Sequence, residues 1–333
     1  MILRTGELDC SVYDRSVTKR LTGVWIKYSA KAQSDAAGGL TGIMSEGLPV
    51  QTATAVQTIG ADIALSGAVS GAVNSLAAKG ARADVVSAEL LLPAGSEEAL
   101  LRCITDQLKD QAQRASVKVA GFRAEVTEAV TRPVIVITAS GSVCWPLKRE
   151  YTAPGEILAL GYIGLEGTAL LARACRQELE KRFPARFLEQ AAALDEELFL
   201  TQTVGTMYRL GIRPGCLVSV RTGGIYAALW NMAEACRCGF DIELTQIPLR
   251  QETIELTDYY GINPYQLCSS GAMLAVVEDA QKAAEQLADA GIFARPIGRL
   301  RGDRDRWIHN GEEVQSLNRP EADSILQVLG GRK

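Results

Sequence analysis

The chain has 333 residues, of which 35 are Lys or Arg and 39 are Asp or Glu, so its formal net charge is −4. With 47% hydrophobic residues it has the composition of a folded protein, and its mild acidity argues against a dedicated nucleic-acid binder. Its apolar stretches fall short of the roughly 18 residues of a membrane span, and its opening lacks a signal-peptide pattern. We therefore expect a cytoplasmic protein with no membrane or nucleic-acid partner. Two lobes are expected, because single cores stop growing near about 250–300 residues.

The first half of the chain combines strand patterns with one clear helix. Ser96 is a suitable N-cap for an amphipathic helix that follows it. The predicted strands are residues 85–93, 117–121 and 133–141. The prolines and charges between Cys144 and Gly155 then favour a domain boundary, which divides the chain into domains of residues 1–150 and 151–333.

Strands and helices alternate more regularly in the second half. The predicted helices are residues 167–183, 224–237, 250–260 and 279–291. The predicted strands are residues 241–248, 271–277 and 293–300. This alternation predicts an α/β or α+β layer structure in each half.

Histidine is almost absent, since His309 is the one histidine of the chain. A multi-histidine metal site is therefore excluded, and the charged, turn-like surroundings of His309 indicate an exposed structural residue. Eight scattered cysteines predict free, mostly buried thiols. Cys236 and Cys238 form the one close pair, and with no second pair or histidine beside them we assign no metal site.

Four segments of the second half carry a recognisable pattern in order and spacing. They are PGEILALGYIGLEGTALLA (154–172), TGGIYAALWNMAEACRCGFDIELTQIPLRQETIEL (222–256), YYGINPYQLCSSGAMLAVV (259–277) and AGIFARPIGRL (290–300). They resemble the aminoimidazole ribonucleotide (AIR) synthetase superfamily and, within it, the hydrogenase-maturation branch. The first half resembles the same family more faintly. Its matching segments are residues 4–17, 71–95 and 119–141.

The resemblance implies a two-domain α/β (α+β) fold with an α/β sandwich as its C-terminal domain. It also implies a homodimer, in which the N-terminal sheets join into a barrel and ATP lies in a cleft at the interface. Residues 36–75, rich in small residues and free of Lys and Arg, fit a buried barrel-and-interface segment. The alternative for that zone is an ordinary helix packed within one subunit. A paralogous protein is a further candidate partner.

Several charged positions of the family's nucleotide site are altered together. Asp35 is the one acid of residues 33–37, and residues 50–58 have no acid where the family's strand carries a magnesium-binding aspartate. The family's Asn-Asp pair is Asn74-Ser75 here. Its Gly-Gly-His-Thr-Glu turn is Gly121-Phe122-Arg123-Ala124-Glu125.

A second family motif, His-Asp-x-Thr-x-Gly-Gly, becomes Val218-Ser219-Val220-Arg221-Thr222-Gly223-Gly224. By the resemblance, the residues that would line a nucleotide site are Asp35, Asn74, Gly121, Arg123, Glu125, Arg221, Gly223 and Gly224. The branch also carries a reactive cysteine on a C-terminal tail. Here the last cysteine is Cys268, so its carbamoyl-to-cyanide chemistry is not expected.

The correlated losses lead to our main hypothesis. The chain is a family member that kept the dimeric scaffold but lost normal Mg·ATP chemistry, because magnesium requires hard oxygen ligands and releases water reluctantly. Such a pseudoenzyme would act as a scaffold, a regulator, a partner of an active paralogue or a binder of a different anion. ATP and magnesium are candidate ligands, and no cofactor or catalytic residue is assigned.

Two other hypotheses stay open. The first is an active ATP-dependent enzyme with a rebuilt site, which needs its polar groups to converge on one cleft. Those groups are Asp35, Asp62, Asn74, Arg123 and Glu125, with Arg221 as a phosphate clamp. The second treats Gly161, Gly164 and Gly167 as a phosphate loop, although their spacing matches neither the dinucleotide fingerprint nor the P-loop.

Overall fold

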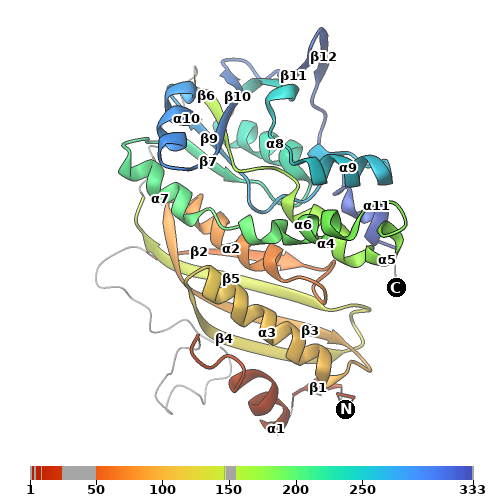
Figure 1. Cartoon of the computed structure of the whole chain (residues 1–333). Helices are drawn as coiled ribbons and strands as arrows, with labels where there is room; N and C mark the ends of the chain where they lie inside the picture. Colours follow the sequence, from red (N-terminus) through yellow and green to blue (C-terminus); the bar gives the residue numbers. More distant parts are fainter. Residues whose placement is uncertain are drawn as a thin grey trace. The chain divides into compact units, whose positions relative to one another are not determined.

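The structure is a computed structural model that describes residues 2–3, 5–8, 10–24, 50–145, 147 and 155–331. The chain divides into two compact units (Figure 1). The first comprises Met1–Leu76 and Ala81–Cys144, and the second comprises Ala77–Gly80 and Trp145–Lys333. The changeover after Cys144 lies at the start of the proline-containing segment, while the assignment of residues 1–150 and 151–333 as family domains stays a prediction.

The first unit is built on a five-stranded sheet in the order β1-β4-β3-β5-β2. Its strands are β1 (Gly6–Glu7), β2 (Val50–Gln57), β3 (Ala81–Pro93), β4 (Lys118–Thr127) and β5 (Val134–Val143). Strands β3 and β4 are parallel, and the other neighbours are antiparallel. The helical elements of this part of the chain are α1 (Cys10–Tyr13), the π-helical turn η1 (Asp14–Thr18), α2 (Ser66–Ala77) and α3 (Glu98–Arg114).

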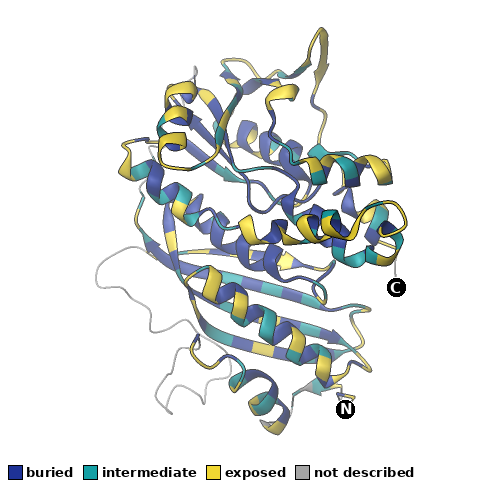
Figure 2. Cartoon of the chain, in the orientation of Figure 1, coloured by how far each residue is buried: buried dark blue, intermediate teal, exposed yellow. Residues whose placement is uncertain are grey.

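One face of this sheet is covered by helices, and the other is less buried among the residues of this unit that the structure describes. Figure 1 shows α2 and α3 over the same face. On α3, Leu101, Ile104 and Leu108 recur at helical spacing and are fully buried. On β4, buried Phe122 and Ala124 alternate with more exposed Arg123 and Glu125, because successive side chains of a strand point to opposite faces. Figure 2 shows the same alternation of buried and less buried positions along the strands of this sheet.

The less buried side of these strands is named the "open face". Thr52, Thr54 and Val56 of β2, Glu89 of β3 and Arg123 of β4 are exposed there, and Glu125 of β4 and Val136 and Thr138 of β5 are half-buried. In register across the sheet, Arg123 is opposite Glu89, Glu89 is opposite Val136, and Val136 is opposite Val56. The five strands of one chain form an open sheet and no closed barrel in the part of the chain that the structure describes.

The second unit contains a seven-stranded sheet in the order β12-β11-β8-β10-β6-β9-β7. Its strands are β6 (Glu156–Leu160), β7 (Cys216–Ser219), β8 (Gly239–Glu243), β9 (Met273–Val277), β10 (Ala294–Arg301), β11 (Arg306–Asn310) and β12 (Glu313–Ser316). Its helices are α4 (Leu165–Ala174), α5 (Arg176–Leu179), α6 (Ala185–Ala193), α7 (Thr201–Arg209), α8 (Gly224–Cys236), α9 (Gln251–Tyr260), α10 (Ala280–Asp289) and α11 (Ile325–Leu329). Three 3₁₀ turns accompany them, η2 (Leu194–Glu197), η3 (Leu244–Gln246) and η4 (Pro264–Gln266).

Apolar side chains pack on both faces of this sheet. On β6, Ile157 and Ala159 belong to the core that contains α8, whereas Leu158 and Leu160 belong to the core that contains α7 and α10. Burial on both faces explains why β6 and β9 read as continuous apolar runs rather than alternating ones. The mixed α/β class predicted from the sequence is confirmed.

Most predicted elements of the second half are present, with two corrections. The single helix expected at 167–183 is wrong, because Cys175 leaves the helical region (φ −108°, ψ 18°) and separates α4 from α5. The strand expected at 241–248 ends at Glu243, where the chain turns into η3. Among the described residues, none of the helices combines the length and apolar character needed to cross a membrane.

Candidate functional site

The residues predicted for a nucleotide site in the first unit do not share one face of the sheet. Gly121, Arg123 and Glu125 lie at alternate positions of β4 and belong to its less buried side. A guanidinium nitrogen of Arg123 lies 3.6 Å from a carboxylate oxygen of Glu125. Asn74 is fully buried on α2, which covers the opposite face (Figure 1).

The acids of the predicted rebuilt site are scattered as well. Asp62 is exposed in the turn that precedes α2. Asp35 lies outside the described residues. Beside Asn74, Ser75 is partly buried and replaces the aspartate of the family's pair. The polar groups required by an active ATP site are therefore not brought together on one side of this sheet by the residues that the structure describes.

Among the residues that the structure describes, those of β2 and α2 offer no carboxylate to a magnesium ion of the family's kind. Strand β2 carries no acid, and α2 supplies an amide and a hydroxyl in place of a carboxylate. Within the described ranges, no group of three or more His, Cys, Asp or Glu is placed to hold a metal ion. Because magnesium relies on carboxylate and phosphate oxygens, we derive no reaction step through it.

In the second unit, the Gly223-Gly224 turn at the start of α8 is bonded to a carboxylate of the chain itself. Both glycines have positive φ, 78° and 63°. Asp323 Oδ2 accepts a hydrogen bond of 2.7 Å from the Gly223 N–H, and its Oδ1 accepts bonds from the N–H groups of Cys268 (3.2 Å) and Ile325 (3.0 Å). An external anion at this helix N-terminus would have to displace Asp323.

Burial dominates the electrostatics around this turn. It raises the pKa of Asp323 to about 6, against the opposing effect of the hydrogen bonds from Gly223 and Ile325. Burial also lowers the pKa of Arg221, while the charge of Glu166 acts in the opposite direction. Glu166, in the first turn of α4, accepts a hydrogen bond of 3.0 Å from the Ser270 N–H. We name Glu166, Arg221, Gly223 and Asp323 the "α8 turn cluster".

The sequence did not indicate Asp323 or Glu166 as partners of this turn. Asp323 is 100 residues from Gly223 along the chain, and local spacing carries no signal for such a contact. Only the folded structure brings the Asp323 carboxylate next to the Gly223-Gly224 turn at the start of α8. Arg221, Gly223 and Gly224 all lie at this turn, while their role in nucleotide binding stays a prediction.

The glycines of residues 161–167 have structural partners. The Gly161 N–H donates to the Phe293 carbonyl (3.2 Å), the Gly164 N–H to the Ser269 hydroxyl, and the Gly167 N–H to the Cys268 carbonyl (3.1 Å). A Cβ at Gly167 would lie 2.4 Å from Leu267. These glycines permit close packing of α4, and their N–H groups are engaged within the protein, which does not support a phosphate loop.

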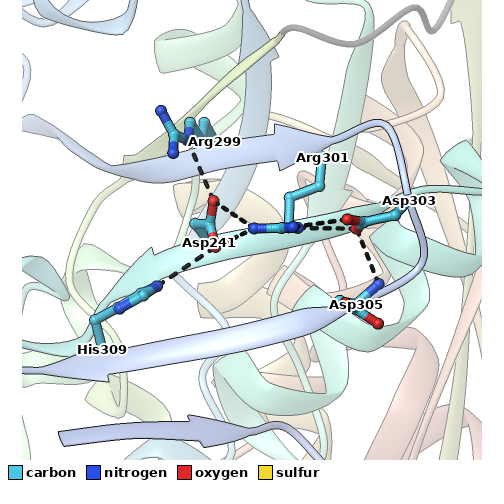
Figure 3. Close-up of polar contacts among 6 residues, drawn as sticks. All are labelled: Asp241, Arg299, Arg301, Asp303, Asp305 and His309. Carbon is cyan, nitrogen blue, oxygen red and sulfur yellow. Dashed lines mark hydrogen bonds and ion pairs between the residues drawn. The ribbon is translucent and has the colours of Figure 1, made fainter.

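His309 takes part in an ion-pair cluster on the outer strands of the second sheet (Figure 3). Asp241 of β8 lies between Arg299 and Arg301 of β10 and His309 of β11, with His309 Nε2 at 3.4 Å from its Oδ1. Burial raises the pKa of Asp241, but hydrogen bonds from Arg301, His309 and Arg299 outweigh it and hold the pKa below its ordinary value. The expected structural role of His309 agrees with this cross-linking of three strands.

Comparison with known proteins gives the family. Residues 155–308 match the model described as AIR synthase related protein, C-terminal domain. A carbamoyl dehydratase HypE of Rhodobacter capsulatus is 32% identical over 252 residues, which are 74% of this chain and 69% of that protein.

Solved structures share the fold of this chain. The crystal structure of the hydrogenase maturation protein HypE in complex with ATP has a TM-score of 0.74 at 17% identity, covering 94% of this chain and 95% of that one. A chain of the HypE–HypF complex has a TM-score of 0.65 at 20% identity, covering 83% and 92%. The chain belongs to the AIR synthetase superfamily. Its relatives lie in the hydrogenase-maturation branch, as the sequence resemblance predicted.

Proposed function

We propose that this chain is a member of the hydrogenase-maturation branch that keeps the family scaffold without the family's Mg·ATP chemistry. The observation that carries the proposal is the absence of carboxylates from β2 and from the Asn74-Ser75 pair on α2. Magnesium bound through one or two carboxylates and nucleotide phosphates would lose its protein ligands there. The chain then acts as a scaffold, regulator or partner of another protein, or as a binder of a different anion.

Arg123 supports the last of these roles. It places an exposed cation where the resembling branch has a histidine, with 57% of its side chain accessible. Its ion pair with Glu125 is solvent-exposed, and such pairs contribute less than about 1 kcal/mol. An anionic ligand that replaces Glu125 as the partner of Arg123 therefore changes the free energy of unfolding little.

The alternative proposal is an active ATP-dependent enzyme with a rebuilt site. It is favoured by the likeness to a HypE solved in complex with ATP. It requires Arg123, Glu125 and Arg221 to act on the nucleotide together with acids from elsewhere in the chain, Asp35 and Asp62 among them.

ATP turnover separates the two proposals. We expect ADP, AMP and phosphate to form from Mg·ATP no faster in the presence of the protein than in buffer alone. Turnover that disappears in Arg123→Ala but persists in Arg82→Ala would establish the alternative. Arg82 is a suitable control because it is an exposed arginine of the same sheet, on β3, paired with Asp84.

We also propose that the open face is the interface of a homodimer. It carries Val56 at 54% exposure, and the neighbouring Val50 of β2 is 39% exposed. Exposed valines on the outer strand of a sheet, here β2, are a surface that proteins normally cover.

Light scattering tests the dimer. The expected mass is twice 35.7 kDa. Val56→Glu is expected to give the monomer mass, because it buries a charge in the interface. Ile254→Glu is the control, since Ile254 is similarly exposed (43%) but lies on α9 of the second unit. A monomer for the unmodified protein, or equal effects of both variants, would contradict the proposal.

A protein partner is a further part of the proposal. Its support is the likeness to a HypE that was solved in a complex with HypF. An active paralogue of this chain is the second candidate partner.

A further inference from the structure

Three aromatic side chains form a surface cluster where the turn after α5 enters α6. The rings of Phe183 and Phe187 are stacked, with their centroids 4.9 Å apart. Tyr259 of α9 meets the Phe183 ring edge-on, with a centroid distance of 5.7 Å. Tyr259 is 39% exposed and the two phenylalanines are half-buried, so water reaches part of this cluster.

Exposed cations alternate with the two phenylalanines along the chain. Lys181 and Arg182 directly precede Phe183, and Arg186 directly precedes Phe187. All three cations are exposed, and the first turn of α6 contains no acid. We name the three cations and the three rings together the "α6 patch". It combines positive charge with accessible apolar surface, which is a combination that proteins use to bind acidic segments.

Two acids that flank the turn are already paired. Arg176 of α5 binds Glu180 at 2.7 Å and lies 3.9 Å from Glu189 of α6. Helix α9 carries acids of its own, which are Glu252, Glu255 and Asp258. We therefore expect an anionic partner to lie over the cations of residues 181–186 rather than over α9.

The β11–β12 hairpin presents the complementary chemistry. Asn310 and Glu313 pair across a two-residue turn of Gly311 and Glu312. Glu312 and Glu313 are exposed, and Val314 of the edge strand β12 is 54% exposed. Figure 1 shows this hairpin projecting from the second unit, away from α5 and α6. We name Glu312, Glu313 and Val314 the "hairpin tip".

We propose that the hairpin tip of one copy of this chain binds the α6 patch of a second copy. The two carboxylates of the tip pair with the cations of the patch, and Val314 covers apolar surface of its rings. Both halves of the contact are exposed on the same chain, so they are always present in equal number.

The contact joins two different surfaces and is therefore heterologous. Repeated head to tail, it links copies into assemblies larger than a dimer. Its small size places it among weak, transient contacts. It is independent of the proposed homodimer, because that dimer uses the open face of the first unit.

Sedimentation of the unmodified protein at low and high salt is the first test. At about 0.01 M salt we expect the average mass to rise with protein concentration. At about 1 M salt the rise should disappear, because the Debye length falls from about 30 Å to about 3 Å. An average mass that does not rise with concentration at low salt would overturn the proposal.

Charge reversal then identifies the two surfaces. The double variants Glu312→Lys/Glu313→Lys and Arg182→Glu/Arg186→Glu should each lose the rise in mass at low salt, because tip and patch then carry like charges. An equimolar mixture of the two variants should regain it, since each tip meets a patch of opposite charge in the other variant. A mixture that stays at the mass of its components would contradict the proposal.

The matched control is Glu278→Lys/Asp289→Lys. It changes the net charge by the same amount as the tip variant, at two exposed acids before and at the end of α10. We expect this variant to assemble like the unmodified protein. Loss of assembly in the control would mean that net charge rather than the hairpin tip governs association, and would overturn the proposal. All substituted side chains are exposed, and circular dichroism checks that each variant is folded.

Discussion

Replacing Asp323 with alanine is expected to lower the free energy of unfolding by about 3 kcal/mol, because three backbone N–H groups lose their acceptor in a buried place. Those groups belong to Gly223, Cys268 and Ile325. Urea unfolding at pH 7 measures the change. The control is Glu321→Ala, an exposed acid two residues away, for which a change within about 0.5 kcal/mol is expected.

The contribution of Asp323 to the free energy of unfolding also depends on pH. The pKa of Asp323 is raised to about 6 in the folded protein, compared with 3.8 as its ordinary value, so the folded state binds the proton more tightly. The stability contributed by this group is therefore fully present below about pH 4 and is lost as the pH rises through 6. The loss is about 3 kcal/mol for two pKa units, as an order of magnitude.

Asp323→Asn isolates that effect, since its amide does not titrate. Between pH 4 and 7 the unmodified protein should lose stability relative to this variant. A difference between the two proteins that stays constant over this range would contradict the buried, titrating carboxylate.

Gly224→Ala is expected to be equally disruptive, at about 3 kcal/mol. Gly224 has φ 63°, and a Cβ there would lie 2.4 Å from the backbone oxygen of Tyr265. The variant therefore combines a left-handed backbone with an overlap against main chain that cannot move aside.

Gly261→Ala is its matched control. Gly261 has φ 62°, but a Cβ there has no neighbour within 4 Å. Only the conformational part of the change remains, about 1 kcal/mol. Urea unfolding of both variants is the measurement. Equal losses would mean that Gly224 is not required by packing, and would favour its role in approaching a ligand.

Local signals in the sequence predicted much of the fold. Helix α9 ends at Gly261 in the left-handed conformation, whereas the N-cap of α3 is Glu97 and not the expected Ser96, whose hydroxyl bonds to the Pro93 carbonyl. Such start and stop signals depend on residues three or four apart. The interruption at Cys175 escaped prediction because a one-residue break hardly changes helical periodicity.

The candidate sites depended on contacts that local patterns do not carry. The bond between Asp323 and Gly223 joins residues 100 apart along the chain. The opposite placement of Asn74 and Arg123 follows from strand alternation combined with which face the helices cover. The family motifs in the sequence were sufficient for the superfamily and its branch, as the comparisons confirm.

The most direct test of the central claim is a calorimetric titration of the protein with Mg·ATP. The account predicts no binding in the micromolar range. Ser75→Asp, which restores one carboxylate on α2, is expected to bind Mg·ATP no better than the unmodified protein, because β2 still lacks an acid. Micromolar binding of Mg·ATP by the unmodified protein, accompanied by release of phosphate, would contradict the loss of the family's nucleotide chemistry.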